Sequence, residues 1–495
     1  MLFTSKTFAL FLLTVFALYW FVFKRNLKGQ NFVLLIASYS FYGWWDWRFL
    51  FLLFFISSSN YLICKRIQNH SQKKHQRILF LLGLIINIGS LVIFKYLNFF
   101  IDSANDIFSF FDANLYLATQ KIILPVGISF YIFISISYII DVYQSRLTAV
   151  RNYFDALLTF SFFPIILSGP IQRPISLLPQ IQNKRLFNNN LAIDGLRQIL
   201  WGLFSKIVIA DRCAVTVNTI FSDSLQYSGS TLLLGIILFT IQIYADFAGY
   251  CNIAIGVGKL LGFKIMTNFA YPYFARNIKE FWRRWNISLS TWFRDYVFLP
   301  LAYTISKKIK SERFLMIKSE QLIYILSITI TWILVGLWHG ANNTFIIWGL
   351  IHGFSLLVYH NCIKHKDKIL KRLNIQKNNF VVATLGTLTT IAIVMCSWVF
   401  FKSPSIHYAL SYISGIFSLS IFSIPYFYGM KMALVTIILI VCFLIVEWFG
   451  RNNDYAIATL GLKWKQPFRW VIYYILIFAI IFLGGGEQKF IYFQF

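Results

Sequence analysis

The sequence has few charged residues, and acidic ones are scarcest. Asp, Glu, Lys and Arg make up 13% of its 495 positions, whereas ordinary soluble domains carry about 25%. Asp and Glu number 18 against 45 Lys and Arg, which leaves a net charge of +27. No hydrophilic stretch is long enough to be a soluble domain. The composition therefore excludes a conventional soluble protein, which at this length would divide into roughly two or three domains.

Cysteine is also scarce, and its spacing excludes two common kinds of site. The six cysteines contain no Cys-x-x-Cys pair. Scattered cysteines indicate small apolar packing residues, not a disulfide framework or a zinc site. We therefore predict no metal site and no bound cofactor. The cysteines are Cys64, Cys213, Cys251, Cys362, Cys396 and Cys442.

Long apolar runs fill most of the chain and determine the fold class. Hydrophobic residues make up 58% of the sequence and aromatic residues 19%. A membrane-spanning helix needs roughly 17–25 apolar residues. Such runs lie at Thr7–Phe23 and Ile78–Phe94, and near 121–140, 153–168, 231–245, 321–338, 344–359, 380–401, 432–446 and 470–486. The sequence predicts an all-α polytopic membrane protein, one domain over residues 1–495, with about 10–13 membrane-crossing or re-entrant helices.

The first apolar run has two possible interpretations, a cleaved signal peptide and a retained helix. Only Lys6 precedes it, the bulky Tyr19 and Trp20 lie near its end, and more hydrophobic segments follow. These features favour a retained first helix.

The positive charge is explained by basic loops between membrane helices, so the sequence predicts no nucleic-acid partner. Basic clusters fall between apolar runs, at Lys65–Arg77, Lys307–Lys318 and Lys364–Lys377. Lys and Arg concentrate in the cytoplasmic loops of membrane proteins. We therefore expect these clusters, together with Lys24, Arg25 and Lys28, to face the cytoplasm, which places the N-terminus outside.

Residues Tyr244–Leu301 interrupt the apolar pattern, being too polar to cross the bilayer simply and rich in aromatics. Within them, the pattern of Arg276–Arg294 predicts an amphipathic helix, lying in the membrane plane or re-entrant. A break could divide this helix into two. Its apolar face contains Ile278, Phe281, Trp282, Trp285, Leu289, Trp292 and Phe293. Its polar face contains Arg276, Lys279, Glu280, Arg283, Arg284, Ser290 and Arg294, with Asn286 at the boundary.

This basic face supports two explanations. Arg276, Lys279, Arg283 and Arg284, beside Trp285, could hold the phosphates of a donor such as a coenzyme A derivative. The same cations could instead anchor the helix to anionic lipid headgroups. The residues alone favour neither phosphate binding nor lipid anchoring.

Two of the seven histidines fall inside apolar segments. His339 lies in Gly336–Gly340, directly after an apolar helix, and the turn that follows includes Asn343. His352 lies about eight residues down the return helix, roughly 12 Å lower at about 1.5 Å per residue, which argues against a His–His dyad. Intramembrane histidines are candidates for proton transfer, because their unperturbed pKa is near neutrality. A structural histidine bonded to a backbone carbonyl is the alternative.

Two weaker signals lie in the same region. Asp246, beside Tyr244 and Tyr250, is a candidate buried carboxylate, or holds a re-entrant segment through hydrogen bonds. Gly256-Val257-Gly258 has the wrong spacing for a nucleotide loop and predicts close helix packing.

These blocks together resemble a known family. The run Asp246–Tyr250 leads to Glu280–Trp285 and Ser288–Tyr296, and then to Gly336–Gly340 and Trp348–Gly353. Further blocks are Ser40–Trp47, Leu124–Tyr131, Ser168–Arg173, Lys206–Arg212 and Ser397–Pro404. The sequence resembles the bacterial membrane-bound O-acyltransferases (MBOAT), in particular those of the alginate O-acetyltransferase type, over nearly its whole length.

The resemblance implies a multi-helix bundle around a transmembrane tunnel in the bacterial cytoplasmic (inner) membrane. It implies that His339 is the catalytic base, supported by Trp338, and that an acyl thioester, acetyl-CoA or an acyl carrier, is the donor substrate. Asn286 departs from the histidine usual in alginate-type enzymes. As an asparagine it could orient the donor or His339, but it cannot act as a base, which argues against a two-histidine mechanism.

The expected reaction is acyl transfer from the thioester to a hydroxyl, with Asn286 or Asn343 as donors to the oxyanion. The resemblance implies an envelope polysaccharide acceptor, such as alginate, exopolysaccharide or peptidoglycan. It would be reached directly, or through a periplasmic SGNH-type acetyltransferase or a polysaccharide-export complex. The alternatives are a D-alanyl transfer protein, a proton-coupled transporter with buried His and Asp, and a membrane scaffold. Internal inverted repeats would favour the transporter, and the sequence shows none.

Overall fold

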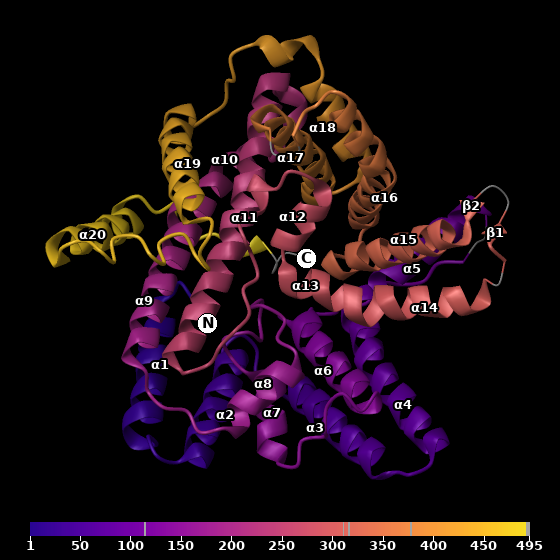
Figure 1. The fold of residues 1–495 in the computed structure, drawn as a ribbon, viewed down its shortest axis with the longest axis vertical. Coiled ribbons are helices and arrows are strands. Elements are labelled where there is room, and N and C mark those ends of the chain that lie inside the picture. The colour runs from indigo at the N-terminus through magenta and orange to yellow at the C-terminus, as the bar shows by residue number, and fades with distance from the viewer. Residues whose placement is uncertain (113–114, 310, 315–316, 377–378, 492–495) are drawn as a thin grey trace. The chain divides into compact units, whose positions relative to one another are not determined.

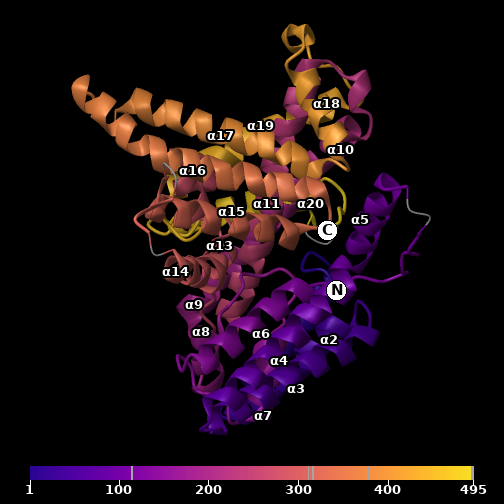
Figure 2. The same ribbon diagram turned by 90° about the vertical axis from the view of Figure 1, so that its right-hand side faces the viewer.

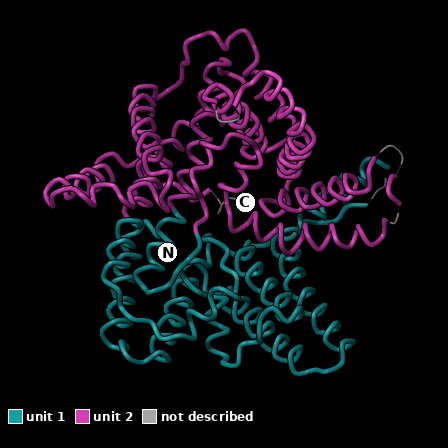
Figure 3. The backbone as a smooth tube through the Cα atoms, in the orientation of Figure 1, with its two compact units in different colours: residues 1–199, 250–266 teal, residues 200–249, 267–495 magenta. Residues whose placement is uncertain are grey.

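The computed structural model describes residues 1–112, 115–309, 311–314, 317–376 and 379–491. Within them the regular structure is helical, apart from one antiparallel pair, β1 (Arg313–Phe314) and β2 (Ile317–Lys318) (Figure 1). The predicted all-α class is therefore confirmed. The chain divides into two compact units, residues 1–199 with 250–266 and residues 200–249 with 267–495 (Figure 3). Lys310 and Lys377, from two of the basic clusters, lie outside the described residues.

The first unit is a packed group of helices whose most buried member is α6. Helices α3, α4 and α6 pack against one another, and α2 and α3 pack on α7. In α6 even Ser135 and Ser137 are fully buried. The helices of this unit are α1 (Lys6–Ala17), η1 (Leu18–Val22), α2 (Leu27–Gly43), α3 (Arg48–Asn69), α4 (Lys73–Leu91), η2 (Val92–Tyr96), α5 (Leu97–Phe110), α6 (Ile128–Tyr143), α7 (Tyr153–Ser161), α8 (Pro174–Gln182) and most of α9 (Asn189–Leu203).

The second unit contains the histidine-bearing hairpin, α15 (Ser319–His339) and α16 (Asn343–Arg372), and α17 (Phe380–Lys402), which packs on α16 (Figure 2). Its other helices are η3 (Phe204–Ala210), α10 (Asp211–Ser222), η4 (Ser224–Gln226), most of α11 (Gly229–Leu260), η5 (Pro272–Phe274), α12 (Ile278–Arg284), α13 (Ile287–Phe293), η6 (Arg294–Phe298), α14 (Leu299–Lys308), α18 (Ile406–Ile416), η7 (Leu419–Phe422), α19 (Met430–Gly450) and α20 (Gln466–Phe482).

Seven helical segments of the described chain are long and apolar enough to cross a membrane. Three shorter apolar helices bring the total to the lower end of the predicted range. The multi-pass prediction is therefore confirmed. The seven are Arg48–Asn69, Lys73–Phe110, Gly229–Leu260, Ser319–His339, Asn343–Arg372, Phe380–Lys402 and Met430–Gly450; the shorter three are Lys6–Val22, Ile128–Tyr143 and Gln466–Phe482.

The predicted interruption over Tyr244–Leu301 begins later than expected, after Leu260, where short helices replace the long one. Helix α11 continues without a break to Leu260, and most of its apolar window is buried. Its polar side chains are satisfied inside the protein, because Asp246 forms an ion pair with Lys206 in the second unit. In the first unit, Asn252 accepts a hydrogen bond from Gln198. A buried helix tolerates polar groups that have partners.

The glycines of α11 pack closely against α9, as predicted for Gly256. A Cβ built on Gly256 would lie 2.5 Å from the backbone oxygen of Gly195. This distance leaves no room for any side chain, so the glycine pair lets the two helices meet backbone to backbone.

Candidate active site around His339

The hairpin that carries His339 is held together by glycines. A Cβ on Gly336 would lie 2.3 Å from the carbonyl oxygen of Phe345, and one on Gly349 would lie 2.2 Å from that of Trp332. The backbones of α15 and α16 therefore touch just below their turn. Asn342 caps α16 by accepting a hydrogen bond from the backbone N–H of Thr344 at 2.9 Å. As predicted, His339 is the last residue of α15, at the turn.

The imidazole of His339 is enclosed by aromatic rings. It lies 4.6 Å from the Trp348 ring, 4.8 Å from Trp338 and 5.2 Å from Phe401, centroid to centroid. His339 is 4% exposed and Trp348 is fully buried. The rings arrive from α15, α16 and α17, so three helices build this pocket. Such surroundings exclude bulk water from the imidazole.

His352 is connected to the same aromatic cluster, but its hydrogen bonds assign it a fixed tautomer. The indole Nε1–H of Trp282 donates to Nδ1 at 3.3 Å, and Nε2 lies 2.9 Å from the Ser397 hydroxyl. An indole N–H can only donate, so Nδ1 carries no proton and neutral His352 is protonated at Nε2. Ser397 accepts that proton's hydrogen bond and donates its own to the carbonyl of Val394 at 2.7 Å. His352 is therefore not placed to activate Ser397 as a nucleophile.

The two histidines are linked through Trp348. The Trp348 ring lies 4.8 Å from His352 as well as 4.6 Å from His339. An aromatic ring between them fits the expectation that they do not form a direct dyad.

The basic helix is broken partway, at Trp285–Asn286. Helix α12 ends at Arg284 and α13 begins at Ile287. Asn286 between them has a φ of 42°, in the left-handed region that asparagine tolerates better than most residues. The Asn268 side chain accepts a hydrogen bond from Ser288 at 3.0 Å and holds the break in place. Asn286 is 2% exposed, and its Nδ2 has no hydrogen-bond partner among the described residues.

Trp285, at the same break, is fully buried among aromatic rings. Its ring lies 5.1 Å from Trp398 and 5.5 Å from Phe281. Trp398 stacks on Trp348 at 5.8 Å. The break that carries Asn286 is therefore joined to the His339 cluster through two tryptophans, Trp398 and Trp348. Trp285 itself is a core residue here, not a surface contact.

The predicted donor-binding cations fall into two groups. Arg276, Lys279 and Arg283 are exposed. Arg284 is half-buried, donates to Glu280 at 2.7 Å and reaches the carbonyl of Ala270 at 3.3 Å. Three cations therefore remain accessible to an anion, while Arg284 holds the local backbone.

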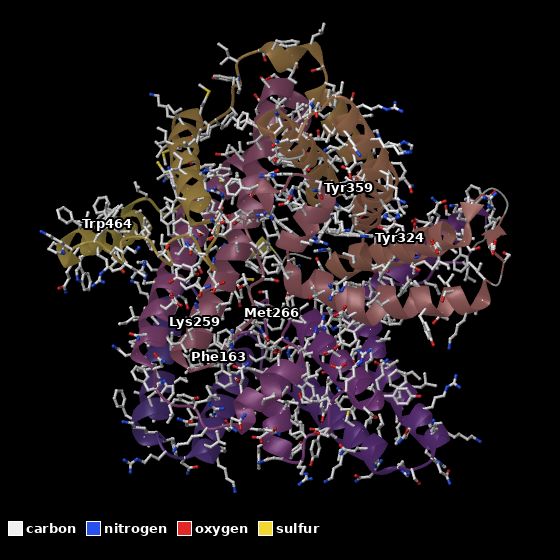
Figure 4. All side chains as sticks on the ribbon, in the orientation of Figure 1. Phe163, Lys259, Met266, Tyr324, Tyr359 and Trp464 are labelled. Carbon is white, nitrogen blue, oxygen red and sulfur yellow. The ribbon has the colours of Figure 1, made fainter. Side chains whose placement is uncertain are left out.

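Arg276 also lines a cavity of about 440 Å³, together with residues of α16 and α17. Tyr359 of α16, another lining residue, is labelled in Figure 4. Its wall is mainly apolar, with Lys366 as a second cation, and Gly386 lets α17 approach the Arg276 backbone. Sequence reasoning missed Lys366, because it counted that lysine only as part of a basic loop.

Asp246 belongs to a buried ion-pair network. Asp246 pairs with Lys206 at 2.6 Å and accepts a hydrogen bond from the backbone of Ile491 at 2.8 Å. Lys206 also pairs with Asp211 at 2.7 Å. These contacts support the interpretation of Asp246 as a structural carboxylate. Asn343 is exposed at the first residue of α16.

The sequence matches the model of MBOAT, the membrane-bound O-acyltransferase family, over residues 11–369. The chain belongs to this family. It is an O-acyltransferase and a multi-pass membrane protein, which decides against the transporter and scaffold alternatives. As a membrane-bound O-acyltransferase it needs an acyl donor as substrate.

Individual relatives agree with this assignment. The chain is 33% identical to the probable alginate O-acetylase AlgI of Pseudomonas putida, over the full length of both proteins. It is 28% identical to the peptidoglycan O-acetyltransferase of Helicobacter pylori, over 100% of this chain and 98% of that protein. It is 29% identical to the teichoic acid D-alanyltransferase of Bacillus subtilis, over 58% of this chain and 71% of that protein.

Proposed function

We propose that this enzyme transfers an acetyl group from a cytoplasmic thioester to hydroxyls of a cell-envelope polysaccharide, with His339 as the general base. The observation that carries the proposal is the burial of His339 among three aromatic rings at the turn of a glycine-packed hairpin. A buried imidazole in this setting is a functional group by default, since burying it without purpose is costly.

The reaction follows from the chemistry of the base. The acceptor hydroxyl adds to the thioester carbonyl carbon while His339 takes its proton, and the carbonyl electrons move onto oxygen. The tetrahedral intermediate collapses, the C–S bond breaks, and the imidazolium returns the proton to the leaving thiolate. No metal or bound cofactor takes part in these steps.

The donor's phosphates bind at the exposed cations Arg276, Lys279 and Arg283. Guanidinium and ammonium groups suit phosphate, and these three are accessible. Arg284 supports them by holding the backbone of α12 through Glu280. Asn286 is a positioning residue at the break, and the mechanism uses one histidine as base.

The tunnel implied by the family resemblance would let the donor enter from the cytoplasm of a bacterial inner membrane and the acceptor from the opposite side. The acceptor class is supported by the relatives named for alginate and peptidoglycan O-acetylation. Transfer occurs directly, or through a periplasmic SGNH-type acetyltransferase or a polysaccharide-export complex. D-alanyl transfer is the second candidate, supported by the shorter match to a teichoic acid D-alanyltransferase.

The experiment compares envelope glycans from cells with and without this protein. Loss of O-acetyl esters from one polysaccharide, restored by the wild-type chain, supports the proposal and names the acceptor. Loss of D-alanyl esters instead would favour the second candidate, and unchanged esters of both kinds would overturn both.

A further inference from the structure

Two buried indole N–H groups in the aromatic cluster that contains His339 have no acceptor among the described residues. Trp348 and Trp398 are both fully buried, and neither Nε1 finds a hydrogen-bond partner among the described residues. Their rings stack at 5.8 Å with an interplanar angle of 21°. Trp348 contacts His339 directly at 4.6 Å, and Phe401 contacts both tryptophans and the histidine.

Leaving such donors unpaired is costly. A buried N–H without a partner costs about 1–3 kcal/mol, and proteins pair nearly all of them. The neighbouring Trp282 shows the ordinary outcome, because its N–H donates to His352 in the same cluster. Two unpaired indoles in one stack, one of them against the candidate base, are the pattern expected of a site that its substrate completes.

We propose that the N–H groups of Trp348 and Trp398 donate hydrogen bonds to the carbonyl oxygen of the acyl thioester. This inference rests on the proposed function. It adds the two N–H groups that stabilise the negative charge on the carbonyl oxygen. As the hydroxyl oxygen adds to carbon, the carbonyl oxygen gains the electron pair and both N–H bonds strengthen. When the C–S bond breaks, the electron pair returns and the carbonyl re-forms.

The indoles meet the requirements for this role better than the asparagines considered from sequence. Trp348 contacts His339, and Trp398 stacks on Trp348. Both are excluded from water and held by stacking, so little reorganisation accompanies charge development. Asn343 is exposed. Asn286 is buried and its Nδ2 has no partner among the described residues, but it lies beside Trp285 at the break, which Trp398 and Trp348 connect to His339.

The test uses Trp348→Phe and Trp398→Phe, which keep an aromatic ring and remove the N–H. Trp332→Phe is the matched control, since Trp332 packs in the same cluster against His352. The probe is a phosphopantetheine ketone, in which a methylene replaces the sulfur of the acetyl thioester and the carbonyl carbon is ¹³C. Infrared spectra are recorded with the full-length protein in lipid nanodiscs.

The wild-type protein should lower the carbonyl frequency of the probe, each of the two variants should reverse part of that shift, and Trp332→Phe should leave it intact. In cells, each active-site variant should lower O-acetyl transfer by roughly 10²–10³-fold, as expected for the loss of one oxyanion donor. An unshifted band in the wild type, or equal shifts in all variants, would overturn the inference.

A separate variant tests the proposed function independently of this inference. His339→Ala should lower transfer by roughly 10²–10⁴-fold and keep the infrared shift. Wild-type transfer by that variant would refute the base while leaving the indole contacts standing.

Discussion

The indole N–H of Trp282 donates to Nδ1 of His352 at 3.3 Å, across α12 and α16. This bond fixes the second intramembrane histidine as a neutral Nε2–H tautomer, and that Nε2–H donates to the Ser397 hydroxyl at 2.9 Å. His352 is thus part of the framework around the site, and His339 is left as the one candidate base in the aromatic cluster.

His352→Ala should therefore be a stability variant. It would leave the Trp282 N–H and the Ser397 hydroxyl without their partner and create a cavity, at a cost of about 2–4 kcal/mol. Thermal unfolding in detergent measures this loss, with Ser397→Ala expected to cost about 1 kcal/mol. A His352→Ala protein of normal stability whose pH–rate profile has lost its acidic limb would show that His352 is the base.

Gly336→Ala should disrupt the hairpin. Its Cβ would lie 2.3 Å from the Phe345 carbonyl, so the helices must separate at a cost of about 1–3 kcal/mol or more. We expect lower unfolding temperature and reduced acyl transfer together. Gly89→Ala in α4 is the control, because its Cβ meets nothing within 4 Å and should be neutral or stabilising. Equal behaviour of the two variants would mean that the hairpin is not tightly packed.

Arg283→Ala and Arg284→Ala should separate binding from structure. The exposed Arg283 is expected to contact donor phosphate, so its loss should raise the donor KM about tenfold with kcat unchanged, and less so at high salt. Arg284 is bound to Glu280 and Ala270, so its loss should lower stability with a smaller change in KM. Steady-state kinetics at two ionic strengths distinguish them. An unchanged KM for Arg283→Ala would favour the lipid-anchoring explanation of this basic face.

Asp246→Ala should unfold the protein rather than slow its chemistry. It would leave the buried Lys206 with only Asp211, and removal of one partner of a buried pair costs about 3–5 kcal/mol. Size-exclusion profiles and thermal unfolding report this loss. A well-folded but inactive Asp246→Ala variant would instead assign this carboxylate to catalysis.

Much of the architecture was predictable because apolar length and charge determine membrane helices directly. The His339 turn, the return helix with His352 and the break in the basic helix all followed from residue order. The break needed one residue, Asn286, that tolerates a positive φ. These are local properties, which sequence reports well.

The rest depended on contacts between distant segments. The continuity of α11 past Tyr244 was missed, since the partner that satisfies Asp246 is Lys206, 40 residues away, with Ile491 at the far end of the chain. The arrangement of the tryptophans in the His339 cluster could not be predicted from the sequence either. Trp348 and Trp398 fell in recognised blocks, but nothing in their spacing indicated that they stack or that their N–H groups are unpaired.

The most direct test of the account is the acyl-transfer rate of His339→Ala, with membrane insertion and stability shown to be intact. Loss of the general base should lower the rate by roughly 10²–10⁴-fold. His407→Ala, which removes an exposed histidine of the same unit, should transfer at the wild-type rate. Wild-type transfer by His339→Ala would contradict the account.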